Sequence, residues 1–127
     1  MHDFVNNTDV KRITDEIWSS GGVVSAICHG TAALLDAETA SGQPLLAGQP
    51  VTGYSRAEDE QIETALGQRV VPFYIEDSLR VAGGEYSHAG THRAHTVVAR
   101  GGRLLTGQNQ ESAAAFGQQL VKLLTQD

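Results

Sequence analysis

Apolar and polar positions along the 127-residue chain switch between helical and strand-like spacing. Apolar residues recur every three or four positions from residue 10 to residue 18 and stop at a Ser-Ser-Gly-Gly run. This pattern predicts an amphipathic helix over Thr8 to Ser19, capped at Thr8 and ended by Gly21. The following "VVSAI" (23–27) is short, β-branched and not alternating, which is typical of a buried parallel strand.

Helix-favouring and turn-favouring segments continue to alternate to the end of the chain. The predicted elements are a helix in "GTAALLDAE" (30–38), a short strand at Val51 to Tyr54, a helix beginning in Asp59 to Ala65, a helix after Pro72 in "VPFYIEDSLRVAGG", a hairpin in "HTVVARGGRLLTG" with its turn at Gly101 and Gly102, and a closing helix in "ESAAAFGQQLVKLL". This alternation predicts an α/β fold with a parallel sheet covered on both faces, in one domain over residues 1–127.

Composition narrows the function classes. Fifteen acidic and nine basic residues give a formal net charge of −6, without the basic stripe that nucleic acid or an anionic membrane surface requires. A single cysteine cannot form an internal disulfide, and no apolar run reaches the ~18 residues of a membrane span. We expect a reduced, cytoplasmic protein that binds neither nucleic acid nor a membrane.

The single cysteine, Cys28, stands where the predicted strand 23–27 ends and a helix-favouring segment begins. A side chain held in a tight strand-to-helix turn projects into the crevice at the carboxyl ends of the strands. The small neighbours Ala26 and Gly30 suit such a turn, and His29 lies directly beside it. A helix N-terminus and a nearby imidazolium both favour the thiolate. We therefore expect Cys28 to be a nucleophile.

Four segments carry a family resemblance: "AICHGTAALL", "VTGYSRAEDE", "VPFYIEDSL" and "GGRLLTGQNQESA". They resemble successive motifs of the ThiJ/PfpI superfamily, the class I glutamine amidotransferase-like fold, and most closely its glyoxalase III and stress-chaperone branch. The motifs occur in family order and span essentially all of the chain. The resemblance implies a doubly wound, flavodoxin-like α/β sandwich and an elbow nucleophile at Cys28, with His29 beside it.

The resemblance also implies the third member of the site. In that branch an acidic residue six positions after the glycine of the "TG" motif completes a Cys-His-acid triad, and counting from Gly53 gives Asp59. Three adjacent acids are also typical of a solvated helix start. Because a one-residue slip is easy in an unaligned loop, Glu58 and Glu60 remain alternatives to Asp59.

The activity implied by the resemblance is the cofactor-independent conversion of a small 2-oxoaldehyde, such as methylglyoxal, to a 2-hydroxy acid. Cys28 would attack the aldehyde, His29 would stabilise the thiolate or relay a proton, and Asp59 would orient His29. The alternative is a holdase chaperone or a redox-sensing protein that uses the same scaffold without turnover. We expect a homodimer in either case.

Departures from the family pattern limit this expectation. Members of the family are roughly twice as long, and "MHDFVNN" resembles the segment after their glycine-rich "GGHG" loop. We therefore expect the C-terminal half of such a domain, with a sheet that is incomplete on its N-terminal side and with little glyoxalase activity alone. The absent front would carry an acidic general base and an oxyanion-hole glycine. Gln110 and Gly101 replace a proline and an aspartate usual in the family, which affects turn geometry more than chemistry.

Two further patterns are weaker. His88, His92 and His95 have a spacing that could bind a metal on a helix, but glycine and threonine interleave them in a segment predicted as loop and strand. The run "GGRLLTGQN" lacks the spacing of a phosphate-binding loop. We expect no metal, nucleotide or other cofactor.

Overall fold

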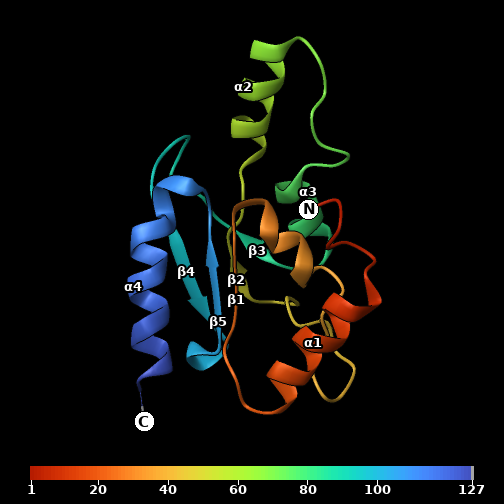
Figure 1. Ribbon diagram of the computed structural model, residues 1–127, viewed down its shortest axis with the longest axis vertical. Helices are drawn as coiled ribbons and strands as arrows, with labels where there is room; N and C mark the ends of the chain where they lie inside the picture. Colours follow the sequence, from red (N-terminus) through yellow and green to blue (C-terminus); the bar gives the residue numbers. More distant parts are fainter. Residues whose placement is uncertain (127) are drawn as a thin grey trace.

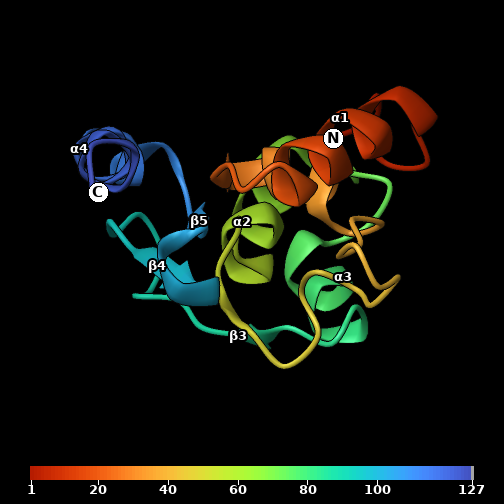
Figure 2. The ribbon, with the colours of Figure 1, turned by 90° about the horizontal axis from the view of Figure 1, so that it is seen from below.

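The computed structural model describes residues 1–126, and helices lie on both sides of its small mixed sheet (Figures 1 and 2). β1 (Val24–Ile27), β5 (Leu104–Gly107) and β4 (Thr96–Ala99) form this three-stranded sheet in the order β1-β5-β4. β1 pairs with β5 in parallel, with Ile27 opposite Gly107, whereas β4 runs antiparallel to β5. The parallel pair places two strand ends side by side.

Four helices surround the sheet. α4 (Ala113–Leu124) packs against β5 and β1, and α1 (Thr8–Ser19) lies on the opposite side, against β1 and the short 3-10 helix η1 (Cys28–Leu34) (Figure 2). α2 (Arg56–Leu66) contacts α3 (Ile75–Val81), which also contacts η1. The remaining elements are short: β2 (Pro50–Val51) and β3 (Glu85–Tyr86), which pair in parallel, and the 3-10 helices η2 (Arg100–Gly102) and η3 (Gln110–Ser112).

Several predicted elements are confirmed. The first helix has the predicted bounds, and the segment 96–107 forms an antiparallel hairpin around Gly101 and Gly102. The predicted cap of the first helix is wrong by one residue. Asn7 is the N-cap, and its Oδ1 accepts hydrogen bonds from the backbone N–H groups of Asp9 and Val10 at 2.9 and 3.1 Å.

Other elements differ from the prediction for local reasons. The segment 30–38 does not form the predicted α-helix. Its first residues belong instead to a 3-10 helix that ends at Leu34. The strand predicted at Val51 to Tyr54 stops after Val51, since the Thr52 N–H donates to Thr106 Oγ1 at 3.0 Å and the Tyr54 N–H donates to the Cys28 carbonyl at 3.4 Å. These two bonds connect the segment after β2 to β5 and η1 instead of continuing the ladder with β3.

The predicted α/β class is confirmed, but the doubly wound parallel sheet is observed only in part. The described residues form a three-stranded mixed sheet and a separate two-stranded parallel pair. The hairpin brings β4 back antiparallel to β5, which a purely parallel sheet would not contain. Within residues 1–126, β1 pairs with one strand only, so its other edge offers unpaired backbone groups.

A continuous core lies between the sheet, η1 and α3. Its largest fully buried apolar side chains come from several elements and loops: Leu34, Leu45, Leu46, Val51, Ile75, Leu79 and Leu104. α1 buries none of its residues, and its apolar Ile13 and Ile17 are 49% and 41% exposed. Among residues 1–126 no helix combines the length and the hydropathy needed to cross a bilayer.

Gly53 allows the segment after β2 to approach η1 closely. A Cβ at this position would lie 2.6 Å from Thr31 Oγ1 and 2.9 Å from the side chains of Ile75 and Leu79. The Gly53 carbonyl also accepts a hydrogen bond from the buried Tyr86 hydroxyl at 2.9 Å. A side chain at position 53 would therefore push apart the elements that hold Cys28.

We predict that Gly53→Ala lowers the free energy of unfolding by about 1–3 kcal/mol, the usual cost of overpacking a core. Gly117→Ala is the matched control, because Gly117 lies inside α4 with open space around it. Alanine there should raise stability by about 0.5–1 kcal/mol, since glycine is unfavourable inside a helix. Urea unfolding of the three proteins measures both effects, and equal midpoints for Gly53→Ala and wild type would contradict the prediction.

Candidate active site

Cys28 occupies a strained turn at the end of β1. Its φ is +63°, in the left-handed region that residues other than glycine seldom adopt. Such a conformation costs roughly 1–3 kcal/mol and persists where the surroundings enforce it. The Cys28 carbonyl accepts hydrogen bonds from Thr31 Oγ1 at 2.9 Å and from the Tyr54 N–H at 3.4 Å. These bonds fix the turn and leave the thiol side chain partly exposed.

The structure brings Cys28, His29 and Asp59 together in a chain of contacts. Cys28 Sγ lies 3.6 Å from His29 Nδ1, and His29 Nε2 lies 2.9 Å from Asp59 Oδ1. Asp59 is fully buried in the first turns of α2, whereas His29 keeps part of its ring accessible. The three residues predicted from the sequence therefore form one hydrogen-bonded relay, with the imidazole between the thiol and the carboxylate.

The two alternative acids point elsewhere. Glu60 is exposed and pairs with Arg56 at 2.5 Å on the surface of α2. Glu58 is fully buried but is directed toward the chain after β5. Asp59 is thus the acid in contact with His29, at the position given by the six-residue step from Gly53.

Two opposing effects set the pKa of His29. Burial of the ring lowers the pKa, but hydrogen bonds and charge attraction from Asp59 and Cys28 outweigh burial and raise it to about 9. The Tyr54 ring stacks on the imidazole, with ring centroids 4.2 Å apart. Burial, together with the charges of Glu58 and Cys28, raises the pKa of Tyr54 to about 12, so its hydroxyl stays protonated at neutral pH. The surroundings of His29 favour the imidazolium.

Asp59 uses only one of its two oxygens. Oδ1 accepts from His29, whereas the buried Oδ2 has no hydrogen-bond partner among residues 1–126. A buried carboxylate without full hydrogen bonding is costly unless a nearby positive charge compensates it. Protonated His29 is the cation placed to do so.

Glu58 has the opposite environment, because both of its oxygens are saturated. Oε1 accepts from Ser55 Oγ and Gln108 Nε2, each at 2.7 Å. Oε2 accepts from Asn109 Nδ2 at 3.0 Å and from the backbone N–H of His92 at 3.1 Å. Burial opposes ionisation, but these neutral donors outweigh it and lower the pKa of Glu58. Glu58 is therefore a buried anion held by hydrogen bonds.

The histidines of the 88–95 segment do not converge on one point. His88 accepts a hydrogen bond from the Gly90 N–H at 3.0 Å, His92 contacts Gln61 at 2.9 Å, and His95 contacts Ser87 at 2.9 Å. A different set of potential ligand atoms does gather, with those of Glu58, His92 and Glu111 within 4.8 Å of one another. Because each Glu58 oxygen already accepts two short hydrogen bonds, a cation would have to displace existing donors.

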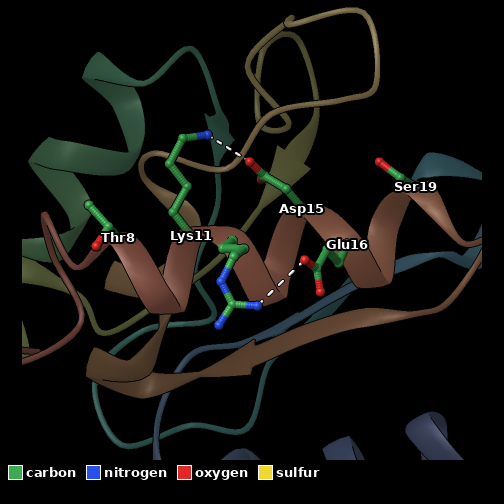
Figure 3. Close-up of a pocket in the computed structure, with 6 residues that line it drawn as sticks. Thr8, Lys11, Asp15, Glu16 and Ser19 are labelled. Carbon is green, nitrogen blue, oxygen red and sulfur yellow. Dashed lines mark hydrogen bonds and ion pairs between the residues drawn. The ribbon is translucent and has the colours of Figure 1, made fainter.

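A hollow of about 440 Å³ lies along α1 and is lined by residues of that helix, with Cys28 not among them (Figure 3). Its charged side chains pair with one another, Lys11 with Asp15 at 2.7 Å and Arg12 with Glu16 at 3.5 Å. Exposed pairs of this kind contribute little energy and leave no free charge for a ligand. The chemistry of the relay makes the region around Cys28 the better candidate site.

Sequence reasoning missed two features of the site. The first is the separate environment of Glu58, although Ser55 and Glu58 have the S-x-x-E spacing of a capping box, which the structure contains. This spacing also predicts the observed start of α2 at Arg56. The second is the stacking of Tyr54 on His29, for which the sequence carries no comparable signal.

No protein-family model matches the chain. Among characterised proteins, it is 33% identical over 122 residues to the glutathione-independent glyoxalase HSP31 of Saccharomyces cerevisiae, covering 89% of this chain and 48% of that protein. It is 31% identical over 121 residues to a bovine glutamine amidotransferase-like class 1 domain-containing protein, covering 95% of this chain and 53% of that protein. The chain thus spans about half the length of the curated relatives it matches.

Solved structures agree with these relatives. The rapid encystment protein of 24 kDa from Francisella tularensis matches with a TM-score of 0.87 and 34% identity, over 98% of this chain and 53% of that chain. Glyoxalase III from Candida albicans matches with a TM-score of 0.79 and 26% identity, over 96% of this chain and 52% of that chain. The chain is therefore a homologue of the glutathione-independent glyoxalases and of class I glutamine amidotransferase-like proteins over about half of their length.

Proposed function

We propose that this chain carries the nucleophilic centre of a glyoxalase that converts a small 2-oxoaldehyde, such as methylglyoxal, to a 2-hydroxy acid without a cofactor. The observation that supports this proposal most directly is the relay from Cys28 through His29 to Asp59, with contacts of 3.6 and 2.9 Å. A strained turn that presents a thiol beside an imidazolium favours the thiolate, which is the reactive form. Homology to glutathione-independent glyoxalases supports this substrate class.

The proposed reaction balances without an external oxidant. The Cys28 thiolate adds to the aldehyde carbon and forms a hemithioacetal. Transfer of the hydrogen on that carbon to the neighbouring carbonyl carbon, through an enediol, oxidises the first carbon to a thioester and reduces the second to an alcohol. Water then hydrolyses the thioester, releases the 2-hydroxy acid and restores the thiol.

His29 and Asp59 have distinct roles in this scheme. Protonated His29 stabilises the thiolate and can return a proton to oxygen during addition. Asp59 holds the ring in one orientation through Nε2 and leaves Nδ1 facing the sulfur. Tyr54 limits rotation of the ring by stacking on it.

The matched relatives are about twice as long as this chain. What a full-length domain would add to the site around Cys28 is therefore a separate proposal. We infer that the full domain is a doubly wound, flavodoxin-like sandwich in which more strands join the open edge of β1. In that domain a second acidic residue would move the carbon-bound proton. This inference draws on the unpaired edge of β1 within residues 1–126.

A holdase chaperone is the second candidate, supported by one specific observation. Ile13 and Ile17 lie one turn apart on α1 and are 49% and 41% exposed, and Phe4 nearby in sequence is 42% exposed. Exposed apolar side chains on one helix can bind unfolded chains. Suppression of aggregation of a model protein, unchanged by Cys28→Ala and lost in Ile13→Ser/Ile17→Ser, would favour this function over turnover.

We expect iodoacetamide to alkylate Cys28 at pH 7 faster than it alkylates a model thiol such as glutathione, because the imidazolium stabilises the thiolate. His29→Gln should slow alkylation at least tenfold, and Asp59→Asn should slow it in the same direction. Glu60→Gln is the matched control, since Glu60 pairs only with Arg56 on the surface. Labelling that requires denaturation would exclude a reactive thiol, and equal rates in all variants would exclude its activation by His29.

The raised pKa of His29 predicts a pH dependence of stability. A histidine whose pKa rises from 6.5 to about 9 on folding stabilises the protein fully below pH 6.5, and this contribution disappears as pH rises through 9. The difference in unfolding free energy between wild type and His29→Gln should thus shrink by ~1–3 kcal/mol from pH 6 to pH 10. Urea unfolding at several pH values measures it. A difference independent of pH would mean that folding does not raise the pKa of His29.

We predict that residues 1–127 alone form little lactate from methylglyoxal, because general acid-base help is typically worth a factor of about 100 to 10,000. Mixing with the separately produced N-terminal half of a related glyoxalase should restore turnover, and Asp59→Asn should then lower it by orders of magnitude. A coupled lactate assay reports both results. Full activity from the chain alone would contradict the prediction and place the base among residues 1–127.

A further inference from the structure

We propose that Glu58 is a positioning residue for the Asp59–His29 pair, acting by fixing the first turn of α2 to the chain that follows β5. Glu58 precedes Asp59 directly in α2, and both side chains are fully buried. The carboxylate of Glu58 binds Gln108 and Asn109, the two residues immediately after β5. Glu58 therefore connects the helix that carries the acid to the strand beside the nucleophile.

The strand register explains why this connection reaches the site. Ile27 and Gly107 are partners in the parallel ladder, so Cys28 and Gln108 follow adjacent strand ends. Glu58 Oε1 accepts from Gln108 Nε2 at 2.7 Å. The first turn of α2 is thereby tied to the strand end next to Cys28, and Asp59 takes its position from that turn.

Only a carboxylate satisfies the donors around Glu58. Five groups donate to its oxygens: Ser55 Oγ, the Ser55 backbone N–H, Gln108 Nε2, Asn109 Nδ2 and the His92 backbone N–H. Glutamine at position 58 would turn its own NH₂ group toward at least one of these donors. A buried donor facing a donor is left unsatisfied, which is costly.

The surrounding amides cannot turn to accommodate such a change. Gln108 Oε1 accepts from the Ala89 N–H at 3.0 Å, and its Nε2 also donates to the Gly90 carbonyl at 2.9 Å. Asn109 Oδ1 accepts from Ser112 Oγ at 2.7 Å, and its Nδ2 also donates to the Arg93 carbonyl at 2.9 Å. Flipping either amide would break both of its other bonds. The orientation of the donors is thus fixed independently of Glu58.

Asp59 depends on this support because its own side chain is held by a single hydrogen bond. Oδ1 contacts His29, and Oδ2 has no partner among the described residues. No second bond on Asp59 can therefore restore its position when the first turn of α2 moves. A small displacement of that turn lengthens the 2.9 Å contact with His29.

The test follows the titration of His29 by NMR of the imidazole, together with the pH profile of Cys28 alkylation, in purified 1–127. We expect Glu58→Gln to fold but to move the His29 midpoint from about 9 toward 6.5 and to slow alkylation at pH 7 at least tenfold, as Asp59→Asn does. Glu60→Gln should match wild type. His92→Asn, which keeps the backbone N–H, controls for the imidazole whose Nδ1 lies 4.0 Å from Glu58 Oε2.

Two outcomes would overturn the proposal. A folded Glu58→Gln protein with lower stability but unchanged His29 titration and alkylation would make Glu58 purely structural. If Glu58→Gln does not fold, Asn109→Ala removes one donor to Oε2 and should still lower the His29 midpoint, and an unchanged midpoint there would also refute positioning. The inference builds on the site of the proposed function, but neither readout requires turnover. Absence of lactate formation would therefore count against the glyoxalase and leave this test intact.

Discussion

The parallel pairing of β1 with β5 is the constraint on which the site depends. Its register places Ile27 opposite Gly107, so the residues that follow, Cys28 and Gln108, leave the sheet side by side. A Cβ at Gly107 would lie 2.9 Å from Ile27 and 3.0 Å from Phe116, which shows how closely α4 and β1 pack at this point. Carboxyl ends of parallel strands are where α/β folds gather functional side chains. This pairing therefore determines the positions of both the Cys28 thiol and Gln108, which donates a hydrogen bond to Glu58.

Two adjacent buried carboxylates in α2 show how environment separates roles. Glu58 accepts hydrogen bonds from hydroxyl, amide and backbone N–H groups, which saturate both of its oxygens and, against burial, lower its pKa. Asp59 meets an imidazole on one oxygen and no partner on the other among residues 1–126. The first arrangement immobilises a turn of helix, and the second leaves a charge that a proton on His29 must balance. Neighbouring residues of the same chemical kind thus serve architecture and electrostatics respectively.

Sequence patterns predicted the local elements better than their connections. The helix at Thr8–Ser19 and the strand ending at Ile27 follow from hydrophobic spacing and from the glycines after residue 20. The parallel partner of β1 could not be predicted this way, because β5 lies some 80 residues further along the chain and pairing over that distance depends on tertiary packing. The predicted parallel sheet is observed only in part, since β5 pairs in parallel with β1 and, through the predicted hairpin, antiparallel with β4.

The structure brings together the three side chains that the sequence singled out, but the sequence did not predict their electrostatics. Cys28 and His29 follow from the strand-to-helix turn, whereas Asp59 required the family resemblance to separate it from Glu58 and Glu60. Spacing alone cannot show which of three consecutive acids faces inward when two of them are buried. The distinction came from the donors that each carboxylate meets, and those from His29, His92 and Gln108 lie thirty or more residues away in sequence.

The left-handed backbone of Cys28 and the Asp59 oxygen that has no partner among residues 1–126 both cost free energy. His29 contacts both residues. The left-handed turn holds Sγ 3.6 Å from Nδ1, and the buried carboxylate holds Nε2 at 2.9 Å. Each contact favours a protonated ring, which explains a pKa of about 9 in spite of burial. A positive imidazolium in turn reduces the cost of burying the Asp59 carboxylate. The charge of the site is therefore shared among the three residues, and the loss of any one of them changes the protonation that the other two support.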